Sequence, residues 1–179
     1  MRLLRERRRD VERVTTSPRA PALMVYRIVE SVDAERAFTG EDSMQEGGRW
    51  SEPGHAVVYS SGSLPLAALE LLVHLDEDVR HKRFVCVAAR IPATVSLTRC
   101  QRLPREWNTQ PPKDASRLVG SRWLRTGRHA VLAVPSAVVP TEHNFLIDPA
   151  HPDFAHIEVS AAVPFRFDPR LVRLRGSDA

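Results

Sequence analysis

Segments typical of β-strands far outnumber segments typical of helices, and this imbalance limits the fold more than any other feature of the sequence. Helices are expected only over 64–78, preceded by Ser63 as N-cap, and over 114–127, which ends at Gly127. Because strands continue to the end of the chain without alternating with helices, the pattern predicts an α+β fold of mostly antiparallel β-sheets with a few short helices. The expected strands are short β-branched or aromatic runs bounded by turn residues, at 23–30, 55–61, 83–91, 93–97, 129–136, 144–147, 156–160 and 164–168.

The positive charge of the chain is concentrated at its N-terminus. The 179 residues have a net charge of +4, and residues 1–19 hold seven arginines against three acidic residues. The remaining residues therefore carry no net charge, whereas nucleic-acid-binding proteins usually carry a basic surface on the folded domain itself. We predict a basic N-terminal extension over 1–21, one domain over 22–175, and no direct contact with nucleic acid.

Cysteine usage and hydropathy indicate a cytoplasmic protein. Cys86 and Cys100 are too few for a disulfide framework or for a zinc site with four cysteines. No apolar run reaches the roughly 18 residues that a membrane-spanning helix needs, so no membrane partner is expected. Glu70 and His74 could share a metal ion on one helix face, but no further ligand has a suitable spacing, and no metal is expected.

Two charged residues occupy apolar surroundings. Arg27 interrupts the apolar strand over 23–30, and Glu70 borders the predicted apolar face of its helix. An inward-facing arginine is costly unless it meets a carboxylate or an anionic ligand. Two interpretations follow, a structural ion pair between Arg27 and Glu70 or a binding site that contains both. The predicted apolar face of the helix comprises Leu66, Leu69, Leu72 and Val73.

A glycine-rich segment adds a third group of candidates. The segment 47–50 reads GGRW, after an irregular stretch over 38–54. Its glycines, Gly48 among them, would let backbone N–H groups approach an oxyanion closely. Arg49 beside Trp50 offers a charged fork next to a flat stacking surface. Ser136, His143 and Asp148 hold the residue types of a hydrolytic triad, but the G-x-S-x-G turn that would support that interpretation is absent.

Six short motifs occur in order along the chain: YRI at 26–28, GGRW at 47–50, YSS at 59–61, LE at 69–70, VPSAVVP at 134–140 and NFLIDPAHPDF at 144–154. Together they resemble the RES domain, a family named for its Arg, Glu and Ser. The resemblance covers 24–172 and implies a fold similar to that of ADP-ribosyltransferases, with NAD as the substrate and no metal. It also implies a toxin that pairs with an antitoxin of the helix-turn-helix (Xre) type.

The resemblance assigns catalytic roles to Arg27, Glu70 and Tyr59. Glu70 would stabilise the positive charge that develops on the ribose, while Arg27 and Arg49 would bind the pyrophosphate. Ser136 would bond the ribose or orient Arg27. Tyr59 would stack on the nicotinamide, and the other expected cofactor-binding residues are Tyr26, Gly48 and Trp50.

The chain departs from the family pattern at two positions. Ser51 follows GGRW where the family usually has Asn, and Asp148 replaces the second Asn of N-x-x-x-N-P. Neither position is among the named catalytic residues. The added charge at position 148 could alter contacts with an acceptor or a partner.

The resemblance implies an enzyme that cleaves the nicotinamide–ribose bond of NAD, which depletes NAD and arrests growth. Either water or inorganic phosphate could accept the sugar, which corresponds to a glycohydrolase or a phosphorylase. The alternative is a mono-ADP-ribosyltransferase that modifies a host protein. A third hypothesis, a nucleic-acid-directed or purely binding protein, would use the basic residues of 1–21.

Overall fold

The computed structural model describes residues 21–75 and 82–173. The predicted basic extension over 1–21 lies, apart from its last residue, outside the described residues. Within them, eight strands form one sheet in the order β4-β5-β6-β2-β1-β3-β7, and β8 pairs with β3. The strands are β1 (Leu23–Glu30), β2 (Val58–Ser61), β3 (Phe84–Ile91), β4 (Leu97–Arg99), β5 (Val131–Pro135), β6 (His143–Ile147), β7 (Glu158–Val159) and β8 (Val163–Phe165).

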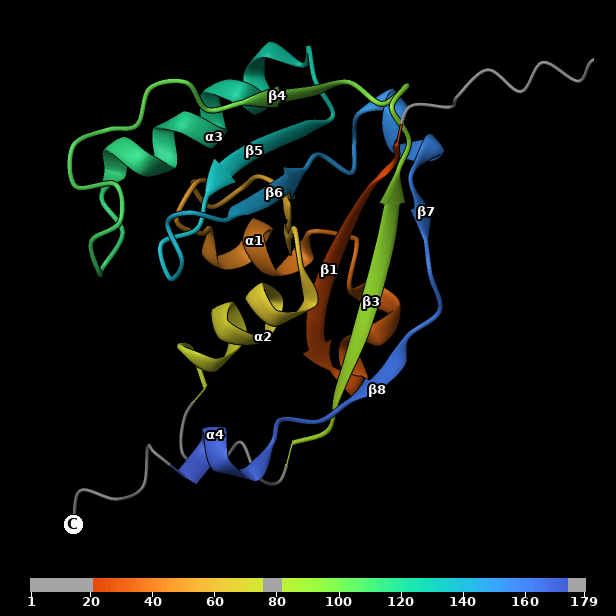
Figure 1. The fold of residues 1–179 in the computed structure, drawn as a ribbon. Coiled ribbons are helices and arrows are strands. Elements are labelled where there is room, and N and C mark those ends of the chain that lie inside the picture. The colour runs from red at the N-terminus through yellow and green to blue at the C-terminus, as the bar shows by residue number, and fades with distance from the viewer. Residues whose placement is uncertain (1–20, 76–81, 174–179) are drawn as a thin grey trace, which may run out of the picture.

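The sheet is antiparallel except between β4 and β5, which run parallel. Figure 1 shows β4, β5 and β6 crossing the direction of β1 and β3, with α1 and α2 beside β1 and α3 against β4 and β5. This arrangement confirms the predicted α+β fold with few helices. The helices are α1 (Glu41–Glu46), α2 (Leu64–Leu72), α3 (Asp114–Thr126) and α4 (Pro169–Arg173), with 3₁₀ helices at Ser31–Arg36 and Pro152–His156.

Two segments differ from the sequence prediction. The predicted strand over 93–97 is mainly a turn, because the Val95 N–H bonds the carbonyl of Pro92 at 3.0 Å, and pairing starts only at Leu97. Helix α1 lies within the stretch that was expected to be irregular. It begins after Gly40 and ends before Gly47, both with positive φ, which glycine adopts without strain.

Helix α2 begins as predicted, and its predicted apolar face is confirmed in part. The hydroxyl of Ser63 accepts the Leu66 N–H at 3.3 Å, which is the expected N-cap. The helix ends at Leu72, whereas the prediction extended to residue 78, and positions 76–78 lie outside the described residues. Leu66 is fully buried and Leu72 packs against an apolar cluster that contains Ala67, as predicted, whereas Leu69 and Val73 are 37% and 45% exposed.

The core fills the space between the sheet and its helices. Val25, Val58, Val131 and Ile147 are fully buried where the central strands meet. Trp50 and Trp123 belong to a second apolar cluster, which holds α3 against the sheet. Among residues 21–75 and 82–173, no helix combines the length and the apolar character that crossing a membrane requires.

Candidate active site

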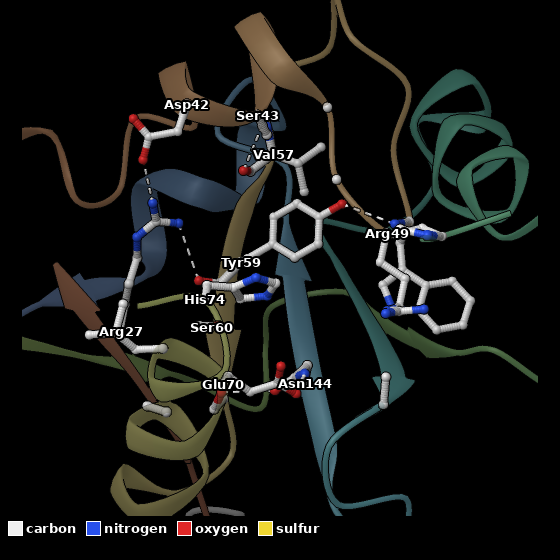
Figure 2. A pocket seen from close by; sticks show the side chains of 18 of the residues that line it. Arg27, Asp42, Ser43, Arg49, Val57, Tyr59, Ser60, Glu70, His74 and Asn144 are labelled. Carbon is white, nitrogen blue, oxygen red and sulfur yellow. Dashed lines mark hydrogen bonds and ion pairs between the residues drawn. The ribbon is translucent and has the colours of Figure 1, made fainter. Parts of the chain in front are cut away.

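A pocket of about 460 Å³ lies where β1, β2, α1, α2 and the start of α3 meet. This volume falls in the range of pockets that bind organic ligands and cofactors. Arg27 and Glu70, which are distant in sequence, both line it, as do Arg49, Tyr59 and Tyr26. Figure 2 shows side chains from β1, β2 and α2 around the same space.

Two donors hold the Glu70 carboxylate in one orientation. The Ser136 hydroxyl donates to Glu70 Oε1 at 2.7 Å, and the Asn144 amide donates to the same oxygen at 2.5 Å. No described residue donates a hydrogen bond to Oε2. The side chains of Glu70 and Asn144 lie next to each other in Figure 2. Glu70 therefore lines the pocket with an ordered carboxylate and one oxygen left for a ligand.

Ser136 is a positioning residue in this arrangement. It is fully buried and is not among the residues that line the pocket. Its oxygen accepts the N–H groups of Val138 and Val139 at 3.0 and 2.8 Å while its proton goes to Glu70. The expectation that Ser136 contacts the ribose or orients Arg27 thus differs from the structure, in which it orients Glu70. Its proton is also unavailable for the base of a hydrolytic triad.

Arg27 pairs with Asp42 and not with Glu70. Its Nη2 lies 2.7 Å from Asp42 Oδ2, and its Nη1 donates to the carbonyl of Tyr59 at 3.2 Å. The structural ion pair between Arg27 and Glu70 that the sequence left open is therefore not formed. Burial lowers the pKa of Arg27, and the charges of Asp42 and Asp33 oppose this shift.

The Nε of Arg27 has no acceptor among the described residues, although it is buried. A buried donor without a partner costs about 1–3 kcal/mol. Arg27 can recover this free energy when an anion enters the pocket that it lines.

The guanidinium of Arg49 mostly bonds the protein itself. Its Nη1 donates to the carbonyls of Trp107 and Thr109 at 3.0 and 2.7 Å, and its Nη2 donates to Gln110 Oε1 at 2.9 Å. Arg49 thereby fixes the segment that contains Gln110 at the wall of the pocket. Burial lowers the pKa of Arg49, and the charge of Glu70 opposes this shift.

The glycines of the GGRW segment do not offer their N–H groups to an oxyanion. The N–H of Gly47 bonds the carbonyl of Ser43, and that of Gly48 bonds the carbonyl of Ser51, both at 2.8 Å. Gly48 has a steric role instead, because a Cβ at this position would lie 2.4 Å from the hydroxyl of Tyr59. The prediction that these glycines bind an oxyanion is therefore corrected: Gly48 makes a packing contact with Tyr59 instead.

Tyr59 is held at the wall of the pocket through its hydroxyl. The Trp50 N–H donates to this oxygen at 3.2 Å, and the Ser51 hydroxyl lies 2.9 Å from it. Burial raises the pKa of Tyr59, while these hydrogen bonds and the charge of Arg117 lower it. Ser51, one of the two departures from the family pattern, thus anchors a pocket residue.

Trp50 does not provide an open stacking surface. The residue is 2% exposed, and its ring stacks on Trp107 with centroids 5.8 Å apart and planes inclined by 24°. Stacking of Trp50 on a nicotinamide ring is therefore corrected to a core contact. Trp50 still contributes to the lining of the pocket, together with Tyr59 and Tyr26.

Sequence reasoning missed several residues at the pocket. Asn144, whose amide bonds Glu70, is the first residue of the NFLIDP motif, and its place in that motif was the sequence signal that could have indicated it. Asp42, Gln110 and Arg117 line the pocket without any signal in the sequence, because tertiary contacts alone bring them there. Asp148, the second departure, accepts the Ala150 N–H at 2.9 Å in a turn outside the pocket lining. Within the described residues, no three His, Cys, Asp or Glu side chains are grouped as metal ligands.

The fold and the site define an α+β protein with a ligand-sized pocket, which contains an oriented carboxylate and several arginines. The chain belongs to the RES domain family, whose profile matches residues 24–168. This match confirms the resemblance found in the sequence.

Curated relatives cover most of the chain. The protein is 33% identical to "Toxin Res" of Photorhabdus laumondii over 155 residues, which is 86% of this chain and 99% of that protein. It is 36% identical to "Toxin Res" of Yersinia enterocolitica, over 83% of this chain and 99% of that protein. It is 37% identical to the "Prs ADP-ribosylating toxin" of Sphingobium sp. (strain YBL2), over 76% of this chain and 87% of that protein.

A solved structure shares the fold. A chain of the M. tuberculosis MbcT–MbcA toxin–antitoxin complex superposes with a TM-score of 0.65 at 15% identity, over 87% of this chain and 90% of that chain. The likeness confirms the fold class that the resemblance implied.

Proposed function

We propose that the protein is the toxin of a toxin–antitoxin pair and that it cleaves the nicotinamide–ribose bond of NAD. Water or inorganic phosphate would accept the ADP-ribosyl group, so that the cell loses NAD and stops growing. The observation that carries this proposal is the Glu70 carboxylate, which Ser136 and Asn144 orient in a pocket that Arg27 also lines. The curated relatives, which are named as toxins, support the assignment.

The chemistry suits these residues. Cleavage of the C–N bond leaves its electron pair on nicotinamide, which departs as a neutral molecule, and positive charge develops on the ribose. No general acid is needed, whereas an anion beside the ribose lowers the barrier. The unbonded Oε2 of Glu70 provides that anion. An oxygen of water or phosphate then bonds the ribose carbon. The proton that water releases passes to solvent, whereas phosphate can attack through an oxygen that carries no proton.

Arg27 supports the anionic half of the substrate in this proposal. Two of the five N–H donors of a guanidinium are used by Asp42 and by the Tyr59 carbonyl, which leaves the buried Nε and two further N–H groups for the pyrophosphate. Tyr59 would contact the nicotinamide with its ring, because its hydroxyl is already engaged.

Release of nicotinamide from NAD tests the proposal. Purified protein free of antitoxin should release nicotinamide with water or with phosphate as acceptor, and absence of release under both conditions would refute it. Glu70→Gln should lower turnover at least about 100-fold. The fold should persist, because the remaining carbonyl oxygen can accept both hydrogen bonds. Glu46→Gln is the matched control, since Glu46 is an exposed carboxylate at the edge of the same pocket.

Transfer of ADP-ribose to a host protein is the second candidate. It is favoured by the Sphingobium relative, which is named as an ADP-ribosylating toxin and is 37% identical to this chain. Labelled NAD added to a cell lysate separates the two candidates. A transferase labels a discrete protein band, whereas a glycohydrolase or phosphorylase labels none.

The proposed partner is an antitoxin of the helix-turn-helix (Xre) type, in the cytoplasm. The support is that the structural neighbour comes from a toxin–antitoxin complex. The antitoxin should copurify with this protein and block nicotinamide release. The nucleic-acid hypothesis predicts instead that toxicity is lost on truncation to Met24 and survives Glu70→Gln. The absence of net charge beyond residue 19 argues against it.

A further inference from the structure

Helix α3 is placed directly against the GGRW segment. A Cβ on Gly120 would lie 1.9 Å from the Trp50 carbonyl oxygen, so the helix backbone approaches this segment as closely as only glycine permits. One residue later, the Ser121 hydroxyl accepts the Glu52 N–H at 3.2 Å. Arg117 precedes these two residues by one helical turn and therefore lies on the same face. It is among the residues that line the pocket.

The three arginines that line the pocket differ in how many of their guanidinium N–H donors form hydrogen bonds to the protein. A guanidinium has five N–H donors. Arg49 makes three hydrogen bonds to the protein and Arg27 makes two. The guanidinium of Arg117 makes no hydrogen bond to any residue in 21–75 or 82–173, and its Nε is buried without an acceptor. Its ion pair with Asp114 is 3.7 Å long, and that carboxylate is 93% exposed, so solvent screens it.

The surroundings of Arg117 suit a phosphoryl group. The planar fork of a guanidinium matches two phosphoryl oxygens, and hydrogen bonds between such charged groups are about twice as strong as neutral ones. The charge of Arg117 also acts on the Tyr59 hydroxyl, which places the guanidinium near the ring that lines the pocket. A buried Nε without an acceptor in the protein is free to donate to a ligand oxygen that reaches it.

We propose that Arg117 is an additional binding residue of the pocket and that it binds phosphoryl oxygens. This inference rests on the proposed function and deepens it. The phosphoryl group has two sources, the diphosphate of NAD or the inorganic phosphate that accepts the ADP-ribosyl group. Arg117 would then supply the bidentate contact for which Arg49, bonded to Trp107, Thr109 and Gln110, has few donors left.

Two measurements on Arg117→Gln test the inference. The first is the Kd for ADP-ribose by calorimetry, and the second is the phosphate concentration that half-saturates nicotinamide release. Loss of one charged hydrogen-bond pair should weaken one of them by about 10- to 100-fold. A weaker Kd assigns Arg117 to the diphosphate, and a higher half-saturating phosphate concentration assigns it to the acceptor.

Arg122→Gln is the matched control, because Arg122 is exposed on the same helix and its removal changes the net charge equally. Arg117→Lys keeps the charge without the fork and should give an intermediate effect, which also covers a failure of Arg117→Gln to fold. If both measurements stay within about twofold of wild type in the Arg117 variants, the inference is wrong. If wild type releases no nicotinamide, the proposed function fails, while the ADP-ribose titration still tests Arg117.

Discussion

Replacement of Ser136 by alanine should lower turnover far more than it changes substrate affinity. The Ser136 hydroxyl donates to Glu70 Oε1 at 2.7 Å but does not line the pocket. A hydrogen bond to a charged group contributes about 1.5–3 kcal/mol. If this contribution is lost in the transition state, kcat falls about 10- to 100-fold. KM for NAD should change less than about threefold, because Ser136 does not contact the substrate.

The same substitution should also destabilise the fold. The Ser136 oxygen accepts the N–H groups of Val138 and Val139, and the residue is fully buried. Unsatisfied buried donors cost about 1–3 kcal/mol. For a chain of this size, about 2–4 °C of Tm is lost per kcal/mol, so Tm should fall by about 2–12 °C. Thermal unfolding and steady-state nicotinamide release, measured on the same preparation, give both quantities.

Ser96→Ala separates positioning from stability. The Ser96 hydroxyl also donates to a carboxylate, that of Asp153 at 2.5 Å, and accepts a backbone N–H, that of Ala130 at 3.0 Å. Neither Ser96 nor Asp153 lines the pocket. Ser96→Ala should therefore lower Tm by a similar amount without lowering kcat. The reasoning is refuted if Ser136→Ala keeps the wild-type kcat, or if both variants lose kcat equally.

Three further predictions concern the other walls of the pocket. Gly48→Ala should lower kcat/KM for nicotinamide release at least about 10-fold, because its Cβ would lie 2.4 Å from the Tyr59 hydroxyl and displace that ring. Asp42→Asn should change the free energy of unfolding by less than about 1 kcal/mol, because the Asp42 side chain is 63% exposed. The same variant should bind ADP-ribose about 3- to 10-fold more tightly in calorimetry, because the Asp42 carboxylate no longer competes with the ligand for Arg27. Weaker binding would show that Asp42 positions Arg27 instead. Burial raises the pKa of Tyr59 above its ordinary value of 10.0, so the folded state favours the neutral phenol, and stability should fall as pH rises above 10. The free energy of unfolding, measured with urea between pH 8 and pH 11, should fall less in Tyr59→Phe than in wild type. An equal dependence on pH in the two proteins would contradict this role of Tyr59.

Local sequence signals determined much of the fold. The strand over 23–30, the N-cap at Ser63 and the helix end at Gly127 appear where the sequence predicted them. Each signal acts over a few residues, through side-chain alternation, a capping hydroxyl or a positive φ. It can therefore be recognised in the sequence without knowledge of the tertiary contacts. The same reasoning singled out Arg27 and Glu70, because charged residues within apolar segments require an explanation.

Tertiary structure alone decided which groups those two residues meet. Arg27 pairs with Asp42 from a helix that the sequence did not predict, and Glu70 bonds residues 66 and 74 positions away. The register between β2 and β6 places Asn144 opposite Ser61, and the turn after β5 carries Ser136 towards α2. Hydrogen bonds are short and directional, so their partners depend on strand register and helix placement, which arise from packing of the whole chain.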